Sequence, residues 1–147
     1  MTQEEKKLLL KDLCARLPYG VILDYSFIED KQRIHTKIPL TYRNIGTVAL
    51  DEWHTNEEIF KPYLRPMSSM TEEEFEELKE YSGLKYEQLD LASFQNGTYK
   101  CLDFYLSEIP SYVVILVFDW LNSHHFDYRG LIERGLALEA PEGMYKF

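Results

Sequence analysis

The sequence predicts an α+β fold, in which a small antiparallel sheet of about three to four strands packs against an N-terminal helix, an acidic middle helix and a buried C-terminal helix. Three observations predict it: leucines recur at helical spacing near the N-terminus, apolar residues alternate over residues 21–40, and a capped segment after residue 70 is rich in glutamate. A chain of 147 residues is about one domain long and buries roughly 70% of its unfolded surface. We therefore expect a single globular domain over residues 1–147.

The N-terminal helix is expected over residues 2–17. Thr2 is a preferred N-cap residue, acidic residues follow it in the first turn, and Leu9 and Leu13 lie one helical turn apart. Pro18 cannot continue a helix, so the helix should end before it.

The apolar period then changes from that of a helix to that of a strand. Residues 21–27 alternate as a first strand, residues 29–32 form a turn, and residues 33–40 form a second strand. A third short strand is expected over residues 45–50, which gives an antiparallel meander that needs one covered face. Residues 59–66 contain two prolines, which exclude a helix interior, so we expect an extended edge segment there.

The acidic middle helix is expected over residues 71–81. Thr71 and Glu74 have the spacing of a capping box, and Gly83 is a typical residue beyond a helix C-terminus. Residues 84–101 show no clear period and receive no assignment beyond a turn at an Asn-Gly pair.

The C-terminal helix is predicted from length. Residues 112–118 are rich in β-branched and aromatic side chains, which also suits a central strand. The apolar pattern continues to His125, too long for an ordinary strand, so we expect a buried helix that begins after Pro110. Asp127 is expected to cap a last short helix that runs through Glu133.

Composition and charge exclude several classes of function. The formal net charge is −9 and the pI is about 4.9, so long-range fields repel phosphate backbones and anionic lipids alike, and neither direct nucleic-acid binding nor membrane binding is expected. Cys14 and Cys101 are the only cysteines, too few for a disulfide scaffold. The N-terminus lacks the apolar run of a signal peptide, and the longest apolar stretch, residues 112–118, is far below the roughly 20 residues that span a bilayer. We expect a cytoplasmic protein.

Known catalytic and cofactor motifs do not occur in the sequence. It lacks the zincin spacing, the Gly-x-Ser-x-Gly elbow, the Walker A loop and the dinucleotide fingerprint. His124 and His125 are adjacent, and adjacent helical residues point about 100° apart, which disfavours a shared metal; an interaction with the last helix carbonyls is the favoured alternative. We expect no cofactor, no metal and no enzymatic activity, and keep as an alternative a small enzyme that uses His124, His125 and Asp127.

The strongest candidate binding segment is residues 61–66. Lys61 and Arg65 are cations on a proline-stiffened segment beside Tyr63, so they could hold a small anion and stack a ring. The alternative is that both cations pair with neighbouring glutamates while Tyr63 packs. The candidate ligand-binding residues come from this segment, its flanks and the C-terminal histidine run: Trp53, His54, Lys61, Tyr63, Arg65, Ser68, His124, His125, Tyr128 and Arg129.

Two blocks of the chain resemble a known group of proteins. Residues 61–66 carry a K-x-x-L-R-P block before an acidic helix, and residues 126–137 carry an F-D-x-x-G-L-I-E-x-G-L-A block. Both are similar to blocks in small uncharacterised proteins of phages and prophages from anaerobic gut bacteria, although this chain lacks the hydroxyl and acid directly after Pro66. The resemblance implies a viral or mobile-element origin and no catalytic residue.

These observations favour a non-enzymatic phage or mobile-element accessory protein in the bacterial host cytoplasm. It would bind a host protein or sequester a small anionic, nucleotide-like ligand, for example in counter-defence. An alternative is an acidic DNA mimic, which inhibits a nucleic-acid-binding protein by presenting carboxylates in place of phosphates. The 11 Tyr, 8 Phe and 2 Trp residues supply enough aromatic surface for a homodimer interface, which also stays open.

Overall fold

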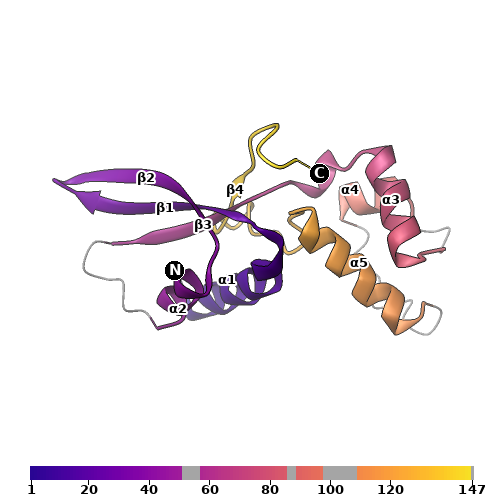
Figure 1. Cartoon of the computed structure of the whole chain (residues 1–147), viewed down its shortest axis with the longest axis horizontal. Helices are drawn as coiled ribbons and strands as arrows, with labels where there is room; N and C mark the ends of the chain where they lie inside the picture. The colour runs from indigo at the N-terminus through magenta and orange to yellow at the C-terminus, as the bar shows by residue number, and fades with distance from the viewer. Residues whose placement is uncertain (51–56, 86–88, 98–108, 147) are drawn as a thin grey trace. The chain divides into compact units, whose positions relative to one another are not determined.

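Two units, each with its own buried core, make up the structure (Figure 1). The computed structural model describes residues 1–50, 57–85, 89–97 and 109–146. Unit 1 comprises Met1–Leu64 and Arg129–Phe147, and unit 2 comprises Arg65–Tyr128. The α+β fold class is confirmed, whereas the single domain stays a prediction, because a grouping by contacts does not test whether either unit folds alone.

Unit 1 contains a four-stranded sheet with the strand order β2-β1-β3-β4. Its strands are β1 (Ile22–Glu29), β2 (Gln32–Pro39), β3 (Ile59–Leu64) and β4 (Leu138–Glu139). β1 and β2 form an antiparallel hairpin. Asp30 and Lys31 connect them with φ values of 49° and 63°, the left-handed geometry of a two-residue turn that matches strand twist. β3 is antiparallel to the other side of β1, and β4 is parallel to the end of β3.

The third strand of the sheet differs from the prediction. It is β3, which lies beside β1 and not beside β2, so the predicted meander is wrong. β3 is extended as expected, but it lies between β1 and β4 and is not an edge strand. Pro62 fits there because Asp24 and Ser26 of β1 direct their backbone groups toward Lys61 and Ile59, so the nitrogen of Pro62 needs no partner in β1.

Helices α1 (Gln3–Arg16) and α2 (Tyr42–Leu50) lie on one face of this sheet (Figure 1). Thr2 caps α1 as predicted, and Glu5 completes a capping box with it. The helices and the sheet share one apolar cluster, whose buried members are Leu9, Leu13, Val21, Leu23, Leu40, Val48, Phe60, Leu64, Leu131, Leu136 and Ala137. Since side chains alternate along a strand, the covered face fixes the polar character of the opposite face.

The strand predicted over residues 45–50 is wrong, because this segment lies in helix α2. The Thr41 N–H donates to Asn44 Oδ1 at 2.9 Å, and the Asn44 N–H donates to Thr41 Oγ1 at 3.4 Å. This reciprocal pair caps the first turn. Ile45 and Val48, three residues apart, then face the apolar cluster together.

The helix predicted from Asp127 through Glu133 is also wrong, because these residues form turns. The Asp127 N–H donates to the Arg65 carbonyl at 2.8 Å, and Gly130 takes a left-handed φ of 73° that a helix cannot continue. The tail after β4 is anchored by Tyr145, whose hydroxyl accepts from the Ile22 N–H at 2.9 Å and donates to the Tyr63 carbonyl at 2.8 Å. Burial raises the pKa of Tyr145 to about 12.

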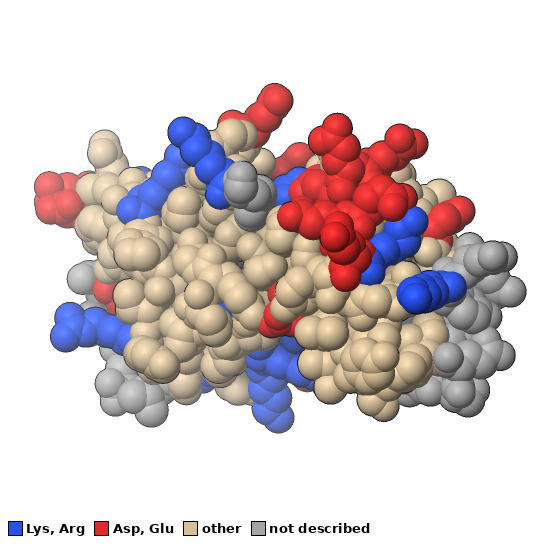
Figure 2. Space-filling model, turned by 45° about the vertical axis from the view of Figure 1, so that its right-hand side comes forward, with Lys and Arg blue, Asp and Glu red and all other residues tan. Residues whose placement is uncertain are grey.

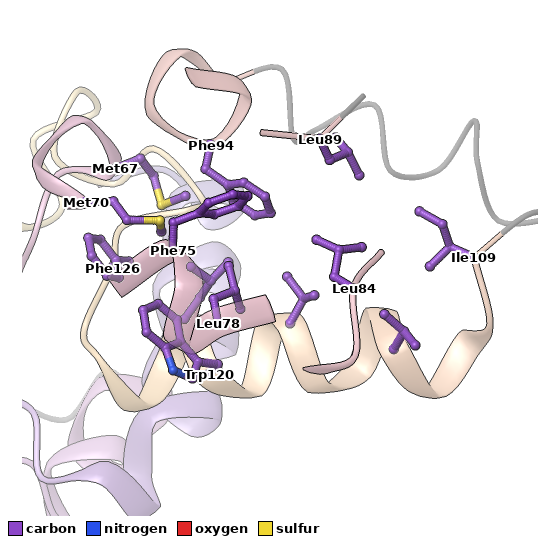
Figure 3. Close-up of a cluster of buried hydrophobic side chains, with 13 residues drawn as sticks. Met67, Met70, Phe75, Leu78, Leu84, Leu89, Phe94, Ile109, Trp120 and Phe126 are labelled. Carbon is purple, nitrogen blue, oxygen red and sulfur yellow. The ribbon is translucent and has the colours of Figure 1, made fainter. Parts of the chain in front are cut away.

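Unit 2 is helical in its described part. It contains the short 3₁₀ helix η3 (Met67–Ser69), α3 (Glu72–Ser82), α4 (Leu91–Asn96) and α5 (Ser111–Ser123). The capping box of Thr71 with Glu74 and the left-handed Gly83 bound α3 as predicted. The apolar helix α5 begins after Pro110 as predicted, and its buried face packs with α3 and α4 around Phe75, Phe94 and Trp120 (Figure 3).

A buried ion network ties α1 to the C-terminal segment of unit 1. Asp12 and Arg16 both lie on α1 and are 0% exposed. Asp12 Oδ2 accepts from Arg16 Nε, and Asp12 Oδ1 accepts from Arg129 Nη1, each at 2.8 Å. The single carboxylate thus pairs with two guanidinium groups in an interior where an unpaired charge is very unfavourable.

Replacing Asp12 by Asn is therefore expected to destabilise the protein strongly. Two arginines lose their counter-charge, so the free energy of unfolding should fall by about 3 kcal/mol. Urea unfolding followed by circular dichroism measures the change. The control is Lys11→Gln on an exposed position of the same helix, which should stay within about 0.5 kcal/mol of wild type. Equal stability of the two variants would contradict a structural role for the network.

Candidate functional site

The open face of the unit 1 sheet carries a polar cavity, which we call the sheet groove. Its volume is about 310 Å³, at the small end of ligand pockets. It is lined by residues of all four strands: Asp24, Ser26, Arg33, His35, Ile59, Lys61, Tyr63 and Leu138. The register explains this set, because Asp24 lies opposite Lys37 of β2 and Lys61 of β3, and Ser26 lies opposite His35, so their side chains share one face.

Asp24 and His35 form the central polar pair of the sheet groove. Asp24 is only 5% exposed, and its two carboxylate oxygens lie 3.2 and 3.0 Å from His35 Nδ1. A carboxylate only accepts, so Nδ1 carries the proton and donates. The His35 side chain is 59% exposed. The pair therefore holds a histidine ring in a fixed orientation at the mouth of the cavity.

Three basic side chains lie on the same face of the sheet as this pair. Arg33 donates to Ser26 Oγ at 2.9 Å and lies 3.5 Å from the Glu57 carboxylate. Lys37 and Lys61 flank Asp24 on its two neighbouring strands, and neither forms an ion pair with another described residue. The cations thus exceed the carboxylates of Asp24 and Glu57, so the sheet groove favours an anion.

Tyr63 supplies an aromatic ring at the same place. The Lys37 ammonium lies 5.6 Å from the centre of this ring, within cation–π range. Burial raises the pKa of Tyr63, and the negative charge of Asp24 raises it further. Tyr63 is therefore a neutral phenol that can stack or hydrogen-bond with a bound group.

A larger cavity of about 590 Å³ adjoins the sheet groove and shares Arg33, Ile59 and Lys61 with it. Three glutamates, Glu5, Glu57 and Glu58, line this larger cavity as well. Four cations, Lys6, Arg33, Lys61 and Arg134, line it too, so its lining has the same excess of one positive charge as that of the sheet groove. In the larger cavity this excess is spread over nearly twice the volume. The sheet groove is thus the better candidate site.

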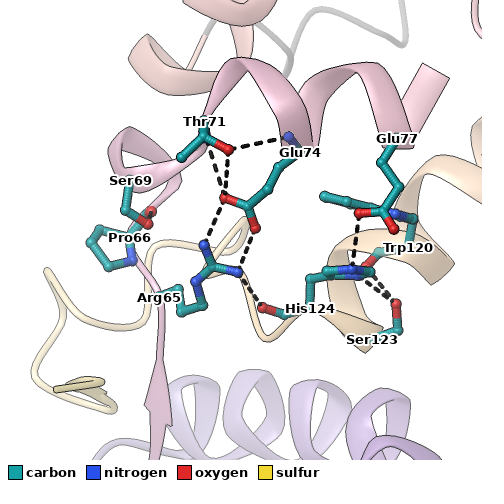
Figure 4. A network of polar contacts seen from close by, with 9 residues as sticks. All are labelled: Arg65, Pro66, Ser69, Thr71, Glu74, Glu77, Trp120, Ser123 and His124. Atoms are coloured by element: carbon teal, nitrogen blue, oxygen red, sulfur yellow. Dashed lines mark hydrogen bonds and ion pairs between the residues drawn. The ribbon is translucent and has the colours of Figure 1, made fainter. Parts of the chain in front are cut away.

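Arg65, a candidate ligand-binding residue, is occupied within unit 2 (Figure 4). Its Nη2 and Nη1 each lie 2.8 Å from one carboxylate oxygen of Glu74, and its guanidinium lies 4.2 Å from the centre of the Phe126 ring. Its N–H donates to the His125 carbonyl at 2.7 Å. Arg65 therefore pairs with a neighbouring glutamate, which is the alternative that the sequence left open.

The C-terminal candidates also make contacts that hold the fold. His124 stacks on Trp120 with ring centres 3.9 Å apart, and its Nδ1 lies 3.1 Å from the Trp120 carbonyl, the helix-terminal role expected for it (Figure 4). His125 is buried with a φ of 63°, Tyr128 donates to Asn122 at 3.0 Å, and Arg129 binds Asp12.

The remaining candidates divide as follows. Lys61 and Tyr63 line the sheet groove, Ser68 is exposed in η3, and Trp53 and His54 lie outside the described residues.

Sequence reasoning did not select Asp24, Arg33, His35 or Lys37 as candidates. A signal existed, because the turn at residues 30–31 fixes the register that places these four side chains on one face.

Comparisons with known proteins give no relative. The chain matches no protein-family model, no curated protein and no solved structure, so the resemblance to phage proteins stays a prediction.

In the described part of the chain, no group of three or more His, Cys, Asp or Glu side chains is arranged to hold a metal ion. Nor is any helix of those residues long and apolar enough to cross a membrane.

The Arg65–Glu74 pair predicts a pH dependence of stability. Burial raises the pKa of Glu74, but hydrogen bonds and charge from Arg65, with hydrogen bonds from Thr71, outweigh it and lower the pKa below its ordinary value of 4.5. The contribution of Glu74 is therefore complete above pH 4.5 and is lost as the pH falls through the lower folded-state pKa. Urea unfolding from pH 7 to pH 3 should show the destabilisation by Glu74→Gln shrinking below that value.

The matched control is Glu73→Gln, in the same helical turn with an exposed side chain. It should differ little from wild type at any pH. A gap between wild type and Glu74→Gln that does not change with pH would contradict the assigned role of the Arg65–Glu74 pair.

Proposed function

We propose that the protein is a non-enzymatic binding protein that holds a small anionic ligand in the sheet groove. The observation that carries the proposal is that Arg33 and Lys61 line one cavity, with Lys37 opposite Asp24 beside it, in a chain whose net charge is −9. Phosphate and carboxylate oxygens are the natural partners of such cations. The Tyr63 ring suits a ligand that also carries a planar group, such as a nucleotide.

This proposal fits a phage or mobile-element accessory protein that sequesters a nucleotide-like signal in counter-defence. Sequestration needs a fixed binding site and no reaction. The Asp24–His35 pair is consistent with binding alone, since the carboxylate orients the imidazole ring and binding needs no nucleophile. Asp24 would also accept a hydrogen bond from an N–H or O–H group of the ligand.

The proposal predicts that removing the charge of Lys61 weakens the binding of small anions. With ATP, cyclic nucleotides and inorganic phosphate as probes, wild type should bind at least one of them at low salt, and Lys61→Gln should bind it about tenfold more weakly. Isothermal titration calorimetry measures the affinity. The control Lys7→Gln removes an exposed lysine outside the cavity and should leave the affinity unchanged. Failure of wild type to bind any probe would overturn the proposal.

A DNA-mimicking inhibitor is the second candidate function, favoured by the surface of α3. Five exposed glutamates lie on this helix, and the acidic side chains gather in one red patch in Figure 2. They are Glu72, Glu73, Glu76, Glu77 and Glu80. Carboxylates grouped in this way can attract the phosphate-binding surface of a basic protein.

This second function predicts a salt-sensitive partner that depends on the glutamates. Changing Glu73, Glu76 and Glu80 together to lysine should abolish capture of a basic partner from host lysate at low salt, because the charge of the patch reverses. A pull-down with quantitative mass spectrometry measures capture, and Lys61→Gln is the control that should not alter it. Capture that survives the charge reversal would exclude the DNA-mimic function.

A further inference from the structure

One edge of the unit 1 sheet is long and unpaired within the described structure. β2 is the terminal strand in the sheet order, and among the described strands it pairs only with β1. It has eight residues, and all of them except Arg33 and Ile38 are exposed. A strand of this length presents a row of backbone donors and acceptors that another extended chain can pair with.

The register identifies which backbone groups point outward. The Leu40 N–H donates to the Val21 carbonyl, and the two-residue turn closes on the pair of Glu29 and Gln32. Because bonded and non-bonded pairs alternate in an antiparallel ladder, the even-numbered residues 32–40 bond β1. The backbone groups of Arg33, His35 and Lys37 therefore face away from the sheet. Pro39 has no N–H and ends the row of outward donors.

The residues with outward backbone groups are also the basic residues of the strand. Arg33, His35 and Lys37 share one face, and β2 contains no acidic residue. A second copy of β2 would place cations opposite cations, which is unfavourable, and lysine on an edge strand is a known protection against self-pairing. A strand with carboxylates at alternate positions would instead match the three basic side chains.

We propose that the β2 edge binds an extended acidic segment of a partner protein as an added strand. Main-chain hydrogen bonds to Arg33, His35 and Lys37 provide the pairing, and alternate acidic side chains of the segment provide the specificity. This inference goes beyond the binding of a small anion. The two sites share Arg33 and His35, but Lys61 lies on β3, two strands away from the β2 edge, and is not part of that edge.

The direct test uses the full wild-type chain and the probe peptide acetyl-Glu-Val-Glu-Val-Glu-Val-amide. Amide hydrogen exchange by NMR should show slower exchange at Arg33, His35 and Lys37 when the peptide is added. Exchange at Ile34 and Thr36 should change little, since their amides already bond β1. The peptide acetyl-Glu-Glu-Glu-Val-Val-Val-amide has the same composition without the alternation and should bind more weakly. Unchanged exchange at the three outward amides, or equal binding of both peptides, would overturn the proposal.

Two variants of one position separate the backbone from the charge. Lys37→Gln removes the charge, whereas Lys37→Pro removes the charge and the outward N–H, a change that an edge strand tolerates. The proline variant should bind the alternating peptide about fivefold more weakly than the glutamine variant. Equal affinities of the two folded variants would show that the backbone edge is not used.

The variant Lys61→Gln distinguishes this proposal from the small-anion function. It should weaken the binding of small anions and leave the affinity for the alternating peptide unchanged. A loss of peptide affinity in Lys61→Gln would place the peptide in the sheet groove and overturn pairing at the β2 edge. Circular dichroism of each variant confirms that the fold is retained before affinities are compared.

Discussion

The carboxylate of Asp12 is the constraint on which unit 1 depends. It is fully buried on α1 and bridges Arg16 of the same helix to Arg129, which begins the C-terminal segment of unit 1. Buried charges are tolerated only when they are paired, so this network joins the N-terminal helix to the returning C-terminal segment. Arg129 is followed directly by the turns that carry Leu131 and Leu136 into the same core as Leu9 and Leu13.

Helices α1 and α2 cover one face of the sheet. Because side chains alternate along each strand, this also determines which polar side chains lie on the other face. Leu23 and Phe60 point into the core, so Asp24 and Lys61, one position away on their strands, point to the open face. A one-residue slip of the hairpin would exchange these sets and bury a lysine against the helices. The polar sheet groove and the apolar core are thus two results of the same register.

Local signals predicted much of the fold, and tertiary contacts decided the rest. The caps of α1 and α3 and the hairpin turn are encoded within a few residues of each other, so they could be predicted. A short apolar run such as residues 45–50 fits strand and helix alike, and only a covered sheet face selects the helix. The helix predicted from Asp127 does not form, because the Asp127 N–H donates to the carbonyl of Arg65, a residue distant in sequence. The proximity of Asp24 and His35 could be predicted from the hairpin register. The proximity of Lys61 to Asp24 could not, because it requires the long-range pairing of β3 with β1.

The buried carboxylate of Asp24 bears on how the sheet groove could bind an anion. A carboxylate that is almost fully buried requires nearby positive charge, and one cation would suffice for that purpose. Arg33, Lys37 and Lys61 together exceed this need. Two of them are positioned by contacts of their own, since Arg33 donates to Ser26 Oγ and Lys37 lies over the Tyr63 ring. Long lysine side chains lose rotamer freedom when they bind, so side chains that are already ordered reduce the entropic cost of association. Asp24 therefore offsets part of the positive charge, the contacts of Arg33 and Lys37 order two of the three cations, and the excess positive charge is left to face a ligand.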